Sequence, residues 1–261
     1  MKILYANGDS FVFGMECLGP ANKNDQNKEF AFPAYLSKSL HCQTYINNAN
    51  CGATNEFIFR KTILDLLAFE KQGQDLKDIF VVIGITSLHR TEVDAASIRQ
   101  LITPHNMKYY QDNNNFPQEI VKYNTLFVNP TCALQISKNV FSNKIVDARK
   151  ITEFLAKYLW TEQVQLESQE ARILALQNFL NFKKINYLFV NTVCPLERTT
   201  NLDLTDPHLY KLDLDSFFDF AMINYPDERQ SHNHFTRVPH EAYAKMLYEY
   251  INNVDLQSKY Q

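Results

Sequence analysis

The sequence predicts an α/β protein with a doubly wound parallel sheet. Three apolar runs are rich in β-branched and aromatic residues: KILYAN at 2–7, DIFVVIGI at 78–85 and INYLFVNTV at 185–193. Continuous runs of this kind are typical of parallel strands that are buried on both faces. Stretches with apolar residues at helical spacing lie between the runs, and this alternation favours helices packed on both faces of one sheet.

One further strand and three helices are predicted between and after these runs. A weaker strand is predicted at 43–49 (QTYINNA). The last predicted helix begins with Pro239, a residue that is favoured in the first turn of a helix. Helices are predicted, from apolar residues at helical spacing, at 55–72, 163–184 and 239–252.

Residues 99–150 do not fit this alternation. The segment is rich in Asn, Tyr, Phe and Pro, and it is longer than an ordinary connection needs to be. Its length and composition are consistent with a lid or binding loop and equally with an ordinary solvent-exposed loop. Because the chain shows no internal repeat and no flexible linker, we predict one domain over 1–261 with an irregular insertion around 99–150.

Composition narrows the class of protein. Lys plus Arg number 26 and Asp plus Glu number 29, so the net charge of −3 gives no field that favours nucleic acid or an anionic membrane. No apolar run approaches the roughly 18 residues of a membrane span. Only a short apolar run follows Lys2, so we expect no signal peptide and a cytoplasmic location where the chain is made. The five cysteines are odd in number and irregularly spaced, which argues against zinc and disulfide frameworks.

The first strand runs directly into Gly8, Asp9 and Ser10. In open parallel sheets, ligands bind outside the carboxyl ends of the strands. Small residues at this point allow a sharp turn and leave the serine hydroxyl accessible. The tripeptide therefore has two interpretations, an ordinary turn or a nucleophile at the end of the first strand.

Two further blocks follow predicted strands. NNANCGATNEFIFR at 47–60 contains Gly52, whose backbone N–H is a candidate donor to an oxyanion, and Asn55, which is a candidate helix cap. IGITSLHR at 83–90 follows the third strand and would by itself be an ordinary loop.

A fourth block, SHNHFTRVPHEAYAKMLYEYI at 231–251, carries three of the seven histidines. Serine is a weak nucleophile unless a base removes its proton, and histidine does this best near neutral pH. His232, His234 and His240 are alternatively metal ligands. The lack of a nearby cysteine or clear carboxylate partner makes that interpretation the weaker one, and we predict no metal site.

Taken together, GDSFVFG, NANCGATN, IGITS and HFTRVPHEAYA resemble the blocks of the SGNH (GDSL-type) hydrolase family, from about residue 8 to residue 251. The resemblance implies a three-layer α/β/α sandwich of the flavodoxin-like type. It also implies an esterase, lipase or carbohydrate deacetylase that needs no metal or other cofactor.

The resemblance assigns roles by position. Ser10 is the nucleophile, and its own N–H and that of Gly52 are oxyanion donors. His234 is the base, because it lies six residues before His240. His240 is then structural, and Asp9 holds the turn.

Two departures from the family pattern stand out. Thr86 takes the place of the family's Asn, and its hydroxyl is a shorter oxyanion donor than an amide. Where the family has an acid two or three residues before the base, this chain has His232 and Ser231. Asp227 and Glu228 are candidates to replace that acid through a bent loop. A backbone carbonyl is the other candidate, and it would leave a Ser–His dyad.

We therefore predict a serine esterase that removes a short acyl group, acetyl above all, from a small-molecule or carbohydrate ester. The alternative is a degenerate fold of the same type that binds glycans or has a structural role in a virion. The TSLHR stretch at 86–90 resembles phage SGNH-like proteins, which implies a virion location or self-association. A flavodoxin-like nucleotide binder is disfavoured, because no GxGxxG or GxxxxGK[ST] follows a strand.

Overall fold

The computed structural model describes residues 2–20, 24–88, 90–94, 125–128, 161–196, 199 and 201–256. The chain divides into two compact units, one made of residues 1–87 and 166–261 and one made of residues 88–165. In the second unit, β4 (Thr91–Asp94) and β5 (Thr125–Val128) form an antiparallel pair. Apart from β5, the predicted insertion at 99–150 lies outside the described residues, so its role and the single-domain arrangement stay predictions.

The first unit contains a five-stranded sheet in the order β2-β1-β3-β6-β7, and every neighbouring pair is parallel. Its two longest strands, β3 and β6, are buried along their whole length, as their continuous apolar sequences predict. The predicted α/β fold class is therefore confirmed. The strands are β1 (Ile3–Asn7), β2 (Thr44–Asn47), β3 (Ile79–Ile85), β6 (Asn186–Asn191) and β7 (Leu209–Tyr210).

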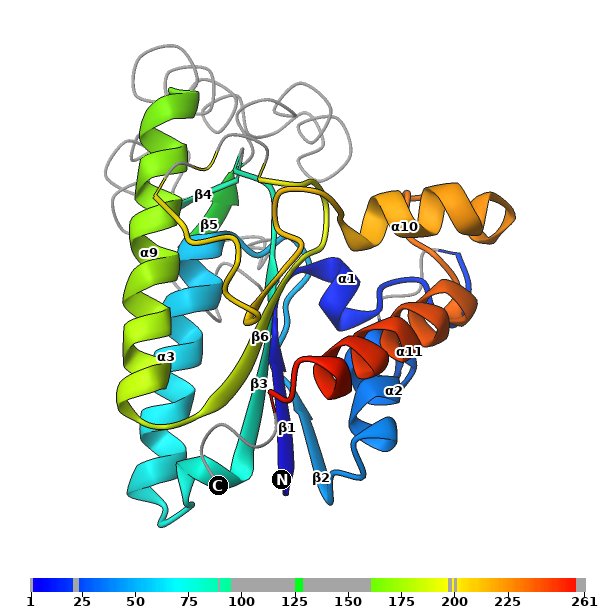
Figure 1. Ribbon diagram of the computed structural model, residues 1–261. Coiled ribbons are helices and arrows are strands. Elements are labelled where there is room, and N and C mark those ends of the chain that lie inside the picture. Colours follow the sequence, from blue (N-terminus) through cyan, green and yellow to red (C-terminus); the bar gives the residue numbers. More distant parts are fainter. Residues whose placement is uncertain are drawn as a thin grey trace, which may run out of the picture. The chain divides into compact units, whose positions relative to one another are not determined.

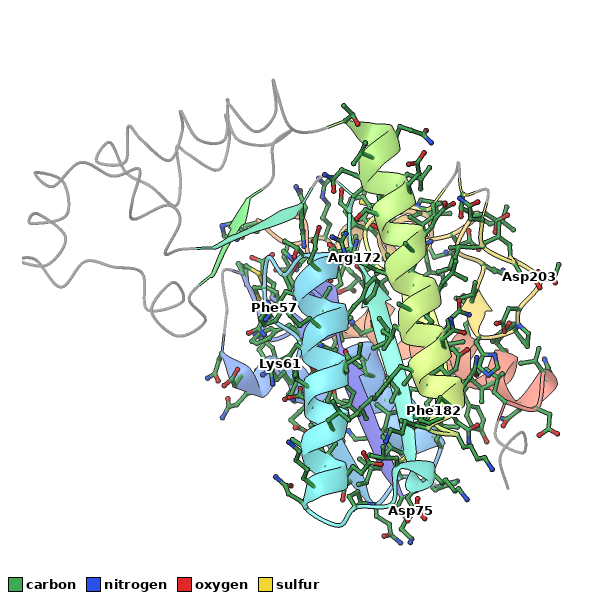
Figure 2. All side chains as sticks on the ribbon, turned by 90° about the vertical axis from the view of Figure 1, so that its left-hand side faces the viewer. Phe57, Lys61, Asp75, Arg172, Phe182 and Asp203 are labelled. Atoms are coloured by element: carbon green, nitrogen blue, oxygen red, sulfur yellow. The ribbon has the colours of Figure 1, made fainter. Side chains whose placement is uncertain are left out.

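Helices cover both faces of this sheet (Figure 1). One face carries α3 (Asn55–Lys71) and α9 (Glu162–Phe182), which lie side by side in Figure 2. The other face carries α1 (Ser10–Phe13), α2 (Phe32–Ser39), α10 (Phe217–Asn224) and α11 (Arg237–Asn253). Short 3-10 turns, η1 (Asp25–Phe30), η2 (Leu76–Asp78) and η4 (Pro226–Glu228), complete the unit.

Ion pairs join the two helices of the first face near both ends of their contact. Arg172 of α9 lies 3.3 Å from Glu56 of α3, and Lys183, just beyond α9, lies 2.7 Å from Glu70 of α3. Figure 2 shows Arg172 of α9 beside the upper end of α3. Within the described residues, no helix is both long and apolar enough to cross a membrane.

The predicted elements are present with small shifts at their ends. The last helix begins at Arg237, two residues before Pro239, because the Thr236 side chain accepts a hydrogen bond from the Val238 N–H and caps the helix there. The short elements α2, α10 and β7 were not predicted. With eight, eight and two residues, they are too short to show a clear periodicity.

The carboxyl ends of β1 and β3 approach each other closely. A Cβ atom added to Gly8 or to Gly84 would lie 2.3 Å from Cγ2 of Val12, so a side chain at either position would push α1 away. These two glycines let α1 sit directly on the strand ends. Helix α1 carries Ser10, so the same glycines also set the position of that residue.

Candidate active site

Ser10 is the first residue of α1, and only Gly8 and Asp9 separate it from the end of β1. The buried Asp9 caps this helix, since its Oδ1 accepts a hydrogen bond from the Phe11 N–H at 3.0 Å. Its Oδ2 accepts a second hydrogen bond, at 2.8 Å, from the hydroxyl of Thr86 at the end of β3. Asp9 therefore holds the turn that presents Ser10, as the resemblance implies.

His234 lies on a tight hairpin that precedes α11. Arg229 and Phe235 form an antiparallel bridge, and the Gln230 N–H donates to the His234 carbonyl at 2.7 Å. Asn233 turns the chain at the tip with a φ of 65°. The hairpin brings Nε2 of His234 to 2.7 Å from Oγ of Ser10, although 224 residues separate the two in sequence.

A third residue, Glu16, meets this pair from the turns that follow α1. Its side chain is fully buried, and its Oε2 lies 3.6 Å from Nδ1 of His234. Oε1 accepts a hydrogen bond from the Ser231 hydroxyl at 2.9 Å and lies 2.8 Å from Nδ1 of His232. Oε2 also accepts from the His232 N–H at 3.1 Å. One carboxylate thus contacts three residues of the hairpin that carries His234.

The structure does not give Asp227 or Glu228 the role proposed for them from the sequence. Asp227 is exposed on η4. Glu228 accepts a hydrogen bond from the Thr236 hydroxyl, and its carbonyl accepts from the Thr236 N–H at 3.1 Å. Glu228 therefore closes the base of the hairpin, and the carboxylate beside His234 is Glu16.

Two backbone N–H groups are placed as candidate oxyanion donors. The Ser10 N–H is the first of α1 and has no acceptor within that helix. Gly52 lies in a turn that the Asn50 N–H ties to the Gly8 carbonyl at 3.1 Å, which brings this loop to the end of β1. Among the described residues, the Gly52 N–H donates to no other group.

The Thr86 hydroxyl does not act as the oxyanion donor that the family resemblance suggested. Its single hydroxyl proton goes to Asp9, at 2.8 Å. Its backbone is held by Asn55, whose Oδ1 accepts from the Thr86 N–H and whose Nδ2 donates to the Thr86 carbonyl, both at 2.9 Å. The cap of α3 is Thr54, so Asn55 fixes the end of β3 instead of capping the helix.

His240 has a different environment from that of His234. It is fully buried, its ring lies 4.4 Å from that of Phe217, and its Nδ1 accepts a hydrogen bond from the Phe32 N–H at 3.2 Å. Burial, with a smaller contribution from nearby His234, lowers the pKa of His240 from 6.5 to about 3. His240 is therefore a neutral residue of the core.

The other two histidines of the block face the Glu16 carboxylate. In the part of the chain that the structure describes, no group of three or more His, Cys, Asp and Glu side chains is arranged to hold a metal ion.

No protein-family model matches the chain, and no curated protein matches it in sequence. Solved structures align with nearly all of it at low identity. A psychrotrophic esterase from a Pseudoalteromonas species has 11% identity and a TM-score of 0.43, covering 97% of this chain and 98% of its own. A variant of an acetylxylan esterase from Geobacillus stearothermophilus has 13% identity and a TM-score of 0.43, covering 96% and 94%.

A GDSL-like lipase from Parabacteroides merdae has 13% identity and a TM-score of 0.41, covering 98% of this chain and 96% of its own. The fold of the chain is α/β, with a parallel sheet between two layers of helices.

Proposed function

We propose that the protein is a serine esterase in which Ser10 is the nucleophile and His234 the general base. The observation that carries this proposal is the 2.7 Å separation of Ser10 Oγ and His234 Nε2. This is hydrogen-bond distance, and it lets the imidazole take the hydroxyl proton as the oxygen attacks. The pair lies at the carboxyl end of β1, between β2 and β3, where open parallel sheets bind their ligands.

In the first step, Oγ of Ser10 forms a bond to the ester carbonyl carbon, and its proton moves to Nε2 of His234. The carbonyl electron pair shifts to oxygen, which becomes the oxyanion. As this intermediate collapses, the bond to the alcohol breaks and the leaving oxygen takes the proton from His234. Water, deprotonated by His234, then attacks the acyl-enzyme, releasing the acid and restoring the Ser10 hydroxyl.

The oxyanion is stabilised by the N–H groups of Ser10 and Gly52. Charge that develops on this oxygen requires donors fixed in advance about 3 Å away. Thr86 donates to Asp9, so this site relies on backbone donors where the family adds a side-chain amide. Loss of one such donor costs roughly a hundredfold in rate, so we expect a slow esterase.

We propose a short acyl group, acetyl above all, carried on a sugar. Ser10 is only 4% exposed, and the ring of Phe11 lies 4.8 Å from that of His234, so a small acyl group reaches the nucleophile most easily. Hydrolysis of acetylated xylose and of a long-chain lipid ester should be compared at equal concentration. Faster hydrolysis of the lipid would overturn this substrate proposal.

The experiment that tests the esterase is labelling with a fluorophosphonate probe, with the adduct located by mass spectrometry. We expect an adduct on Ser10 in the native protein, none in Ser10→Ala, and much slower labelling in His234→Asn. Circular dichroism controls for folding. A folded native protein that stays unlabelled would contradict the proposal.

The second candidate is a catalytically degenerate protein that binds glycans. It is favoured by the hydrogen bond that the Thr86 hydroxyl donates to Asp9. If this alternative holds, a glycan array shows glycans that still bind to Ser10→Ala. The native protein then hydrolyses no ester of these glycans.

A further inference from the structure

We propose that Glu16 is the acidic member of this site, a positioning residue that orients His234 and stabilises its protonated form. This inference rests on the proposed function, because it gives the base a partner for its second ring nitrogen. The acid then follows the nucleophile in sequence, instead of lying two or three residues before the base.

The first argument is the direction of the carboxylate. Nε2 of His234 faces Ser10 and Nδ1 faces Oε2 of Glu16, so the imidazole lies between the two residues. A base that accepts the serine proton at Nε2 must carry its own proton on Nδ1. A negative charge on the Nδ1 side favours this tautomer and the imidazolium that follows.

The second argument is distance. At 3.6 Å, Oε2 of Glu16 and Nδ1 of His234 are within ion-pair range but beyond an ordinary hydrogen bond. Attraction between opposite charges at this range favours the charged imidazolium, and it is screened little by water when the carboxylate is fully buried. Glu16 therefore acts on His234 mainly by its charge, and on the hairpin by its hydrogen bonds.

The third argument is the cost of placing Glu16 there. Its side chain is fully buried, and its backbone has a φ of 68°, a left-handed conformation that is uncommon for residues other than glycine. Burial of a carboxylate and a left-handed backbone are both unfavourable, and such costs concentrate at functional sites. The contacts of Glu16 with Ser231 and His232 offset part of the unfavourable free energy of burying this carboxylate.

Three other ionisable groups lie near Ser10 and His234, namely His232, Asp9 and His240. His232 contacts Glu16 and is about half exposed, and Asp9 next to Ser10 is engaged by Thr86. His240 lies behind His234 and stays neutral above about pH 3. Glu16 is the carboxylate at ion-pair distance from His234, so removing its charge should change the titration of that histidine.

The test is an NMR titration of the histidine Cε1–H signals in the native protein and in Glu16→Gln. Signals of His232 and His234 are assigned by loss in His232→Asn and His234→Asn. We expect the His234 signal to titrate at lower pH in Glu16→Gln, by about one pH unit or more, because an adjacent opposite charge shifts a titration by that amount. An unchanged His234 titration would overturn the proposal.

Two controls separate charge from structure. Glu170→Gln removes another buried carboxylate, on α9, that accepts hydrogen bonds from Thr199 and Asn201, and it should leave the His234 titration unchanged. Ser231→Ala removes one hydrogen bond to Glu16 but keeps its charge, and it should leave that titration unchanged as well. If Glu16→Gln does not fold, Glu16→Asp replaces it, and its withdrawn carboxylate should shift the titration in the same direction by less.

Fluorophosphonate labelling of the same variants then relates Glu16 to reactivity. We expect labelling of Ser10 to slow about a hundredfold or more in Glu16→Gln and to be partly restored in Glu16→Asp. A shifted titration together with an unlabelled native protein would contradict the esterase and support the role of Glu16. A labelled native protein with an unshifted titration would do the reverse.

Discussion

His234 and His240 lie six residues apart and have opposite chemical environments. The side chain of His234 is 12% exposed, between a serine hydroxyl and a buried carboxylate. His240 is fully buried among aromatic rings, and its partner is a backbone N–H. The first environment provides a partner for each ring nitrogen and an opposite charge. The second excludes the charged form.

The difference shows that the environment, and not the residue type, decides which histidine can act as a base. A group that moves protons at neutral pH must be able to carry both protonation states. His240 cannot do so, since burial lowers its pKa to about 3. His234 faces Glu16, which compensates for the charge that it acquires in the proposed reaction.

The largest effect is expected at His234. His234→Asn should lower the rate of ester hydrolysis on the order of 10⁴-fold or more, because the serine loses its base. The melting temperature should change little. Rates are measured with 4-nitrophenyl acetate and compared with His240→Asn, which should keep the rate within about tenfold. A similar loss in both variants would remove the distinction between the two histidines.

Substitution of His240 should lower the free energy of unfolding more than substitution of His234 does. His240→Ala removes a ring that stacks on Phe32 and Phe217 and leaves the Phe32 N–H without its acceptor. We expect the free energy of unfolding to fall by about 3 kcal/mol, from the cavity and the lost hydrogen bond. Urea denaturation measures it, and a loss below about 1 kcal/mol would show that the aromatic cluster does not depend on this ring.

The same histidine predicts a dependence of stability on pH. Its pKa falls from 6.5 in the unfolded chain to about 3 in the folded one, so between these values the unfolded chain binds the extra proton. The free energy of unfolding should therefore fall as the pH is lowered from 6.5, by about 3 kcal/mol at pH 4.5 for this group.

His240→Asn is the matched variant, because its Oδ1 can accept from the Phe32 N–H and cannot titrate. Urea denaturation at pH 7 and pH 4.5 should show a smaller loss in this variant than in the native protein. Equal losses would assign the acid sensitivity to other groups.

The smallest effect is expected at His232, the remaining histidine of the block. The His232 side chain is 53% exposed, and the hydrogen bond from its backbone N–H to Glu16 is retained when the side chain is replaced. His232→Asn should change the rate of ester hydrolysis by less than about fivefold and the melting temperature by a few degrees at most. A much larger loss of rate would mean that His232 assists the reaction directly.

Much of the fold could be predicted because its central strands are long and apolar. The runs at 78–85 and 185–193 became β3 and β6, and the stretch at 55–72 became α3. The two-residue β7 has no such pattern.

The site was predictable only where the order of its residues along the chain agrees with the family blocks. Ser10 and His234 were both proposed from these blocks, and the structure brings them together. Glu16 carries no comparable signal in the sequence. A glutamate six residues after Ser10 would ordinarily be solvated, and its left-handed turn and the hairpin at 231–234 bury it beside His234.

The closeness of Ser10 and Glu16 in sequence has a consequence for assembly. Both belong to one short segment after β1, so their relative placement is local and costs little chain entropy. The turn that contains Gly52 and the end of β3 at Thr86 join this segment from farther along the chain, and the hairpin that carries His234 closes the longest loop, of 224 residues. Ser10 and Glu16 are therefore the part of the site with the least loop entropy to lose, and the contact with His234 is the part with the most.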